Sequence, residues 1–404
     1  MTASFKLYKP LPFIACTLLF ALSGCGGGSG SSVEDTNGQL KNNYTATNFV
    51  ATSAAYNPTF ATDANFADAW GIAIRPPGAG GHFWVTAGNA TYEYQGDVNG
   101  QPLSQDALKK VALPGGGRAT GTVYNGTATS FVLTQSHPNG DITAGAKFLF
   151  ATDSGVISAW TERKKSDGSY DRPDAAKIVI DQSAQGVQFF GLAINPTYDR
   201  LYAANFGTNP GVKVFDANFN DISATVKFTN PFAVDTNNVK PGEYAPFNVQ
   251  VLGNSVFVAY AQTSEDPAAP GHLLAATEVH APGSGRLAEF DLNGKLIGVW
   301  NDGGKLNAPW GLVITPANFG LLSNTLLVGN FGEGTIVAFD RTTHAPVNYV
   351  RAANGAPLVV PGIWGLIFGN GVALGDTNAL YFASGPEDEK GGVFGSIRYT
   401  PVKK

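Results

Sequence analysis

Short apolar runs, each bounded by Gly, Pro, Asn or Asp, recur along the chain from about residue 44 onward. Apolar residues at helical spacing do not extend over any useful length between these runs. Runs of this kind predict β-strands. Most of them are continuously apolar and do not alternate with polar residues, so we expect strands that are covered on both faces.

One phrase appears six times: an aromatic residue or Thr at its head, usually followed by Gly, and then an apolar run. The intervals between heads are about 50–70 residues, the length of a propeller blade. A second apolar run follows most heads, and a third often ends in Phe-Asp, where Asp216, Asp291 and Asp340 are expected to close turns. The six heads are Trp70, Thr120, Phe190, Phe247, Trp310 and Trp364.

These repeats predict an all-β fold, a six-bladed β-propeller. The Gly after the head permits close approach of the innermost strands at the axis. The second unit has two runs that fit the second strand, "SFVLTQ" from Ser130 and "KFLFATDSGVISAW" from Lys147, so we expect an extra hairpin there. The last unit has only three strands, and Thr45–Ser53 precedes the first head. We expect this N-terminal strand to close the ring in the last blade, which removes an open edge.

Composition supports a globular β-protein. The chain has 404 residues, of which 43% are hydrophobic and 14% charged, and it contains 50 Gly. A net charge of −5 gives no electrostatic support for a nucleic-acid partner, and we expect a monomer. Both cysteines, Cys16 and Cys25, lie before the repeats, so disulfides and thiolate metal sites are excluded from the propeller itself.

The N-terminus predicts a lipoprotein signal. Lys6 and Lys9 precede the apolar segment "LPFIACTLLFAL", which is too short to span a bilayer, and "LSGC" follows. "LSGC" resembles the lipobox of bacterial lipoproteins, with Cys25 as the lipidated residue; an ordinary secretory signal is the alternative. The predicted division is a signal peptide at 1–24, the lipidated Cys25 with a Gly/Ser-rich tether at 25–43, and the propeller at 44–401.

Several phrases resemble those of an uncharacterised bacterial family of secreted six-bladed propellers, some of which carry PEP-CTERM tails. They include "APWGLVITP", "LLVGNFGEGTIVAFD", "LYAANFG" and "YAPFNVQ". More distantly, "LYAANFG…VKVFD" is similar to the repeat of NHL and gluconolactonase-type propellers. The resemblance implies the six-bladed fold but no established activity. Gly26 after Cys25 resembles lipoproteins sent to the outer membrane, which implies a cell-envelope location and the membrane as a partner.

The fifth residue of each second strand should point to one rim of the channel. We therefore expect Asn205, Asn330 and Tyr260, with the adjacent Asp153, to form a ligand-binding rim under the insert Ala261–Gly285. Their oxygens could hold Ca²⁺, as the resemblance to gluconolactonase-type enzymes implies. The alternative is that both Asn residues close tight turns. The aromatic heads could form a floor for a ligand or simply pack between blades.

Three functions stay open at this stage. The first is a lipid-anchored propeller that binds a small molecule or protein, or serves as an interaction scaffold. The second is a Ca-assisted hydrolase or lactonase with its site at the channel mouth, and the third is a structural surface protein. The five His residues show no metal-ligand spacing, and no complete catalytic constellation is visible. Binding therefore ranks first.

Overall fold

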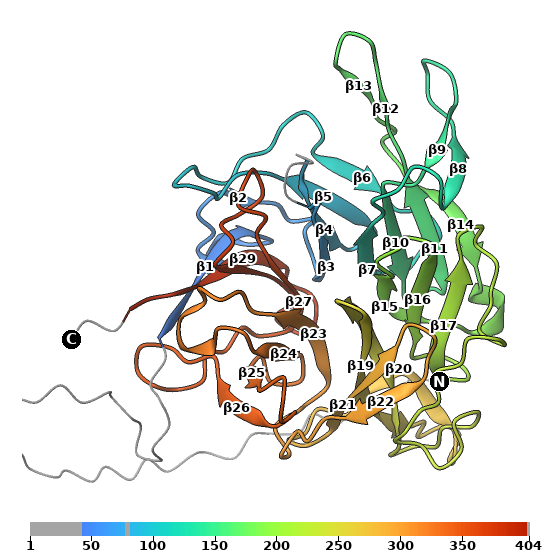
Figure 1. The fold of residues 1–404 in the computed structure, drawn as a ribbon, viewed down its shortest axis with the longest axis vertical. Coiled ribbons are helices and arrows are strands. Elements are labelled where there is room, and N and C mark those ends of the chain that lie inside the picture. The colour runs from blue at the N-terminus through green and yellow to red at the C-terminus, as the bar shows by residue number, and fades with distance from the viewer. Residues whose placement is uncertain (1–42, 77–80, 402–404) are drawn as a thin grey trace, which may run out of the picture.

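The computed structural model describes residues 43–76 and 81–401, in which six β-sheets are arranged around a central axis and two further sheets have two strands each (Figure 1). The predicted all-β, six-bladed propeller is confirmed. The predicted signal peptide, Cys25 and tether lie outside the described residues. Within the part of the chain that is described, no helix is both long and apolar enough to cross a membrane.

Each head lies in the innermost strand of a blade, as predicted. Blade 1 has the order β3-β4-β5-β6, blade 2 β7-β10-β11-β14, blade 3 β15-β16-β17, blade 4 β18-β19-β21-β22 and blade 5 β23-β24-β25-β26. Blade 6 has the order β27-β28-β29-β1-β2. The innermost strands are β3 (Ala69–Ala73), β7 (Ala119–Tyr124), β15 (Phe189–Ile194), β18 (Tyr244–Leu252), β23 (Pro309–Ile314) and β27 (Ile363–Phe368).

The outer strands follow in chain order. The second strands are β4 (Phe83–Ala87), β10 (Phe148–Thr152), β16 (Arg200–Asn205), β19 (Ser255–Glu265), β24 (Leu326–Asn330) and β28 (Ala379–Ser384). The third strands are β5 (Ala90–Tyr94), β11 (Val156–Trp160), β17 (Gly211–Asp216), β21 (Gly285–Asp291), β25 (Ile336–Phe339) and β29 (Val393–Tyr399). The outermost strands are β6 (Lys110–Ala112), β14 (Lys177–Asp181), β22 (Leu296–Val299), β26 (Pro346–Tyr349), β1 (Tyr44–Ala51) and β2 (Ala61–Thr62).

Additional elements decorate the blades. The extra hairpin predicted in the second unit is β8 (Val132–Gln135) with β9 (Ile142–Gly145), and it projects from the ring beside the ribbon β12 (Arg163–Lys164) and β13 (Tyr170–Asp171) (Figure 1). In blade 4, β20 (Leu273–Glu278) pairs with β19. Short 3₁₀ turns are η1 (Ala54–Tyr56), η2 (Ser183–Gln185) and η3 (Gly320–Leu322).

The Gly after the head allows neighbouring blades to meet at the axis. In all six blades the innermost strand has a bulge or register irregularity where the head lies, for example between Ala69 and Ile72. A Cβ on Gly121 would lie 2.6 Å from the backbone nitrogen of Leu192 in the next blade. Blade 4 has Asn248 at this position, and its Nδ2 donates to the carbonyl oxygen of Trp310 in the next blade at 2.7 Å.

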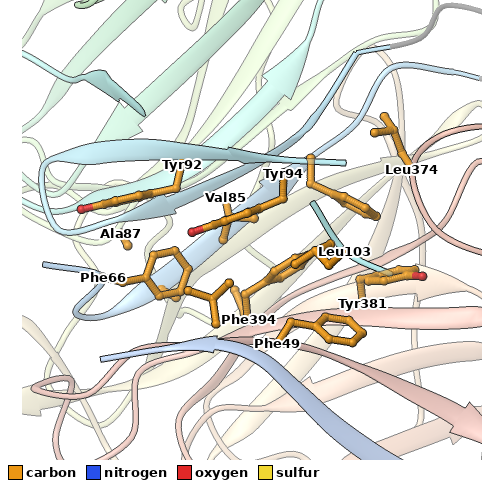
Figure 2. Packing of buried hydrophobic residues seen from close by; sticks show 14 of the residues in the cluster. Phe49, Phe66, Val85, Ala87, Tyr92, Tyr94, Leu103, Leu374, Tyr381 and Phe394 are labelled. Carbon is orange, nitrogen blue, oxygen red and sulfur yellow. The ribbon is translucent and has the colours of Figure 1, made fainter. Parts of the chain in front are cut away.

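The ring closes as predicted, with β1 paired antiparallel to β29 (blue beside red in Figure 1). Phe49 of β1 packs against Phe394 of β29, and Phe394 stacks on Tyr94 of blade 1, as Figure 2 shows. The chain ends are therefore held by backbone pairing and by a buried aromatic cluster. Backbone pairing and the aromatic cluster depend on each other, because strands β1 and β29 contribute to each of them.

The three Phe-Asp ends close turns, as predicted. Asp216 accepts backbone N–H bonds from Asn218 and Asn220, and Asp291 accepts them from Asn293 and Lys295. Asp340 accepts from Thr342 and Thr343. These carboxylates stabilise turns at the ends of third strands and are not gathered into a site.

Candidate functional site

The aromatic heads fill one end of the axis. Trp364 stacks between Trp70, at a centroid distance of 3.9 Å, and Phe331, at 3.7 Å. Trp310 packs edge-on to both tryptophans, and Phe190 contacts Trp70 at 5.4 Å. Buried aromatic pairs of this kind stabilise a core beyond their area burial. We call this cluster the aromatic plug; its buried members are Trp70, Phe190, Phe206, Val239, Ala245, Phe247, Ala261, Ala308, Trp310, Phe331 and Trp364.

A cavity of about 540 Å³ lies over the aromatic plug. Five blades contribute to its wall, and two members of the plug, Phe190 and Phe331, form part of its floor. This volume lies within the range of small-molecule sites. We call this cavity the mouth; its lining is Arg118, Phe190, Ala276, Glu278, His280, Phe331, Gly332, Glu333, Val359, Pro361, Gly362, Gly385, Pro386, Glu387, Asp388 and Glu389.

Arg118 is the centre of a charged cluster in the mouth. Its Nε lies 2.7 Å from Asp153 Oδ2, and its Nη1 lies 3.2 Å from Asp68 Oδ2 and also pairs with Glu389. Its backbone N–H donates to Asp153 Oδ1 at 2.6 Å. The guanidinium lies 5.2 Å from the centroid of Trp70. One cation is thus shared among three carboxylates and held against the plug.

Burial changes the protonation of this cluster. Burial, together with the adjacent Glu389 carboxylate, raises the pKa of Asp68 to about 8, although Arg118 and the Trp364 indole N–H oppose the rise. Burial also raises the pKa of Glu389. For Arg118 burial acts in the opposite direction, but its carboxylate neighbours raise its pKa further, so this side chain stays charged. Burial therefore favours the protonated form of Asp68 near neutral pH.

A strained acidic turn forms one wall. Glu387, Asp388 and Glu389 all have left-handed backbone conformations, with φ of 58°, 52° and 66°. Left-handed residues other than Gly cost on the order of 1–3 kcal/mol each and persist only where surrounding contacts hold them. The backbone N–H of Gly391 donates to Pro386 O at 2.9 Å and closes the turn. Three carboxylates in sequence are thereby presented at the mouth.

The insert of blade 4 supplies the opposite wall. Ala276, Glu278 and His280 come from β20 and the residues after it. His280 Nε2 lies 2.7 Å from Glu278 Oε1, and this contact raises the pKa of His280 despite partial burial. The His280 ring also packs edge-on against Phe331 at 5.2 Å. The expectation that this insert overhangs a rim agrees with these contacts.

Asn205 and Asn330 make the contacts expected of turn-forming residues. Asn205 is fully buried; its Oδ1 accepts from the backbone nitrogens of Gln188 and Gly207, and its Nδ2 donates to Thr208 O. Asn330 is equally buried, and its Oδ1 accepts from Asn307 N at 3.1 Å. Both amide oxygens are thus bonded to backbone N–H groups of nearby turns, as the turn-closing alternative requires.

Tyr260 and Asp153 lie in different surroundings. Tyr260 is buried in the core between blades 3 and 4 and packs edge-on against Phe232 at 4.9 Å. Burial raises its pKa. Asp153 is bonded to Arg118, which lines the mouth. Of the four predicted rim residues, only Asp153 belongs to the charged cluster, and none of the four lines the cavity itself.

The sequence signal for the mouth lies elsewhere in the repeat. Asp68 and Arg118 occupy the same position in neighbouring blades, two residues before the heads Trp70 and Thr120. Asp68 is also left-handed, with φ of 49°, as is Gly362 at the same position of blade 6. The segment "GPEDEKGG", from Gly385, is an acidic loop between a second and a third strand. Such a rim loop is a candidate because propeller loops often carry function.

The described residues offer little for a tightly bound metal ion. Within residues 43–76 and 81–401, no three His, Cys, Asp or Glu side chains are placed so that they could hold one. Ca²⁺ takes six to eight oxygen ligands. The Asn205 and Asn330 oxygens, which the sequence offered for this purpose, are bonded to backbone N–H groups.

Comparisons with known proteins give relatives without a known function. The chain is 28% identical over 339 residues to the uncharacterized protein R648 of Acanthamoeba polyphaga mimivirus, which covers 83% of this chain and 76% of that protein. It is 27% identical over 337 residues to the uncharacterized protein L690 of the same virus, covering 83% and 81%. No family model matches. These relatives give no support to the bacterial, secreted family that the sequence phrases suggested.

Two solved structures are similar at the level of the fold. Hydrazine synthase of Kuenenia stuttgartiensis aligns over 84% of this chain and 97% of that chain, with 12% identity and a TM-score of 0.44. A gluconolactonase of Xanthomonas campestris aligns over 63% of this chain and 82% of that chain, with 14% identity and a TM-score of 0.34. At this level of similarity neither neighbour says anything about the activity of this chain.

Proposed function

We propose that this protein is a ligand-binding propeller whose site is the mouth, and that it is held at the cell envelope by a lipid on Cys25. The observation that carries the binding proposal is the cavity of about 540 Å³ over the aromatic plug. It combines apolar floor residues with a few polar side chains that converge from several blades, the usual composition of a small-molecule site.

The direction of the strands is compatible with an anchor. Innermost strands begin at the mouth, where Phe190, the second residue of β15, lines the cavity, and they end at the other face of the ring. Strand β27 is antiparallel to β28, β28 to β29, and β29 to β1. Tyr44 at the start of β1 therefore lies at the face opposite the mouth. A tether that enters there would leave the mouth free to receive a ligand.

A blocked mouth tests the binding proposal. Ala276→Trp places a large side chain in the cavity wall, whereas Val132→Trp changes an exposed residue of the distant β8–β9 hairpin. We would screen a fragment library by ligand-observed NMR against the wild type and both variants. Hits lost with Ala276→Trp and kept with Val132→Trp support the mouth. Fragments that still bind the Ala276→Trp variant, or a screen without any hit, would contradict the binding proposal.

Changing Cys25→Ala tests the anchor. The variant is expected to move from the membrane fraction to the soluble fraction, because residue 25 loses the thiol that would carry the lipid. Unchanged partition would show that "LSGC" is not a working lipobox.

The Ca-assisted hydrolase alternative makes a separate prediction. A bound ion should raise the melting temperature of the wild type with Ca²⁺ and lower it with EDTA, and Asn205→Ala with Asn330→Ala should remove the shift. Ligand at a hundredfold excess over Kd stabilises a fold by about 2.7 kcal/mol. If neither Ca²⁺ nor EDTA changes the melting temperature of the wild type, this alternative is wrong.

A further inference from the structure

The charges of the mouth do not balance. Five carboxylates line the cavity, and Arg118 is the one side chain of its lining with a permanent positive charge. Arg118 is already paired with Asp68, Asp153 and Glu389, of which two lie outside the lining. His280 is engaged with Glu278. The remaining lining carboxylates are Glu333, Glu387 and Asp388.

Asp388 is the least committed of these groups. It is exposed, and among the described residues no hydrogen bond or ion pair involves its side chain; its charge adds to those that raise the pKa of His280. Glu333 lines the same cavity from the turn between β24 and β25, where Thr335 Oγ1 lies 2.6 Å from its Oε1 and the side-chain amides of Asn307 and Asn330 donate to its carboxylate. Carboxylates on two walls of a concave site focus a negative potential on the space between them.

The floor and rim of the same cavity are apolar. Phe190 and Phe331 lie below, and Ala276 and Pro361 contribute further carbon atoms. Val359 leaves 53% of its surface exposed although it stands in the lining. Aromatic floors favour cations as well as apolar groups, since the face of each ring is negative. A ligand that satisfies both features needs an apolar body and a positive charge.

We propose that the mouth binds a small organic cation, with an ammonium or guanidinium group between Glu333 and Asp388 and an apolar body over Phe190 and Phe331. This inference rests on the mouth being a ligand site, as proposed above, and adds the chemical class of the ligand. The cavity is large enough for a body of several carbon atoms. A bare metal ion would leave the apolar floor and the exposed Val359 without a partner.

Three probes that share a phenylalkyl group and differ in charge test whether the ligand must be a cation. They are 4-phenylbutylamine, 4-phenylbutanol and 4-phenylbutyrate, which are positive, neutral and negative at neutral pH. Binding to the full chain is measured by isothermal titration calorimetry, and the bound position is located by NMR. The amine is expected to bind at least tenfold more tightly than the alcohol, and the acid more weakly still. Added salt should weaken the binding of the amine, since the attraction is partly solvent-exposed.

Two isosteric variants test the residues. Asn readily adopts the left-handed conformation of residue 388, so Asp388→Asn removes a charge with little backbone strain. Combined with Glu333→Gln, it is expected to reduce amine affinity at least tenfold and to leave alcohol affinity within twofold. Asp141→Asn, in the distant β8–β9 hairpin, is the matched control and should change neither.

The outcomes separate the two proposals. The cation proposal would be wrong if the alcohol or the acid bound tightly in the mouth, or if the double variant kept its affinity for the amine. In both cases the mouth would remain a ligand site. The cation proposal would also be wrong if none of the three probes bound at millimolar concentration while fragments did bind in the mouth. Failure of probes and fragments alike would overturn both proposals.

Discussion

Glu93 is a buried carboxyl group without a compensating charge. It is fully buried in β5, opposite Trp84 of β4, and neither carboxyl oxygen has a hydrogen-bond partner among the described residues within the usual geometry. Burial raises its pKa well above the ordinary value of 4.5. The folded protein therefore holds a proton that the unfolded chain releases more easily.

This proton makes stability depend on pH in a defined direction. Below about pH 4.5 the carboxyl is neutral in both states and its contribution is fully present. As the pH rises from 4.5 toward the folded-state pKa, the unfolded chain ionises and the fold loses about 1.4 kcal/mol per pH unit. Glu93→Gln removes this loss, so we expect the variant to gain stability over the wild type as the pH rises.

Urea denaturation of the two proteins across this pH range measures the effect. The difference between their free energies of unfolding should grow with pH and then level off. A constant difference would show that Glu93 has the same pKa in both states. Asp68 needs a separate experiment, because the neighbouring Glu389 carboxylate raises its pKa while Arg118 lowers it.

At the level of the element, each blade depends on the close approach of innermost strands. Gly121→Ala is expected to destabilise the fold by about 1–3 kcal/mol, because its Cβ would meet Leu192 of the next blade at 2.6 Å. Gly298→Ala is the control, since Gly298 lies in the edge strand β22 with open space around it. Thermal denaturation compares the two. Equal melting temperatures would show that strand approach at the axis is loose.

Features that repeat from blade to blade could be predicted from the sequence, and features that occur once could not. The heads, the three Phe-Asp turns and the closing strand are local patterns that repeat, so their places in the blade follow from spacing. The mouth does not repeat. Its charges come from Asp68 and Arg118 before two heads, from the loop at Glu389 and from the insert at Glu278, and they meet only when the ring is closed.

The predicted rim positions illustrate the limit. The ends of the second strands are indeed equivalent, because Asn205 pairs with Phe189 and Asn330 with Pro309 in the same register. Equivalence placed them near one end of the axis but could not reveal what their amides contact. In the structure backbone N–H groups of adjacent turns take those contacts. Side-chain direction at a strand end depends on the turn that follows, which the repeat pattern does not specify.

At the level of the whole molecule, the ring is closed by the strand nearest the N-terminus of the described chain. Strand β1 buries Tyr44, Phe49, Val50 and Ala51 between blades or against β29. A fully buried large apolar side chain contributes about 1.5–3 kcal/mol. The larger of these side chains together contribute a large part of the roughly 5–15 kcal/mol that stabilises a typical domain.

Deleting residues 44–53 from the full chain should therefore lower the melting temperature severely, because it exposes the edge of β29 and uncovers Phe394. A deletion of 26–42, which precedes β1, is the matched control and should leave the melting temperature of the propeller unchanged. Adding a peptide of residues 43–53 in excess should restore part of the loss, since the open edge of β29 presents the same backbone groups to it. Restoration by a scrambled peptide of the same composition would indicate non-specific edge pairing. If the chain that lacks β1 melts like the wild type, closure does not hold the ring together, and the five other interfaces between blades must be sufficient on their own.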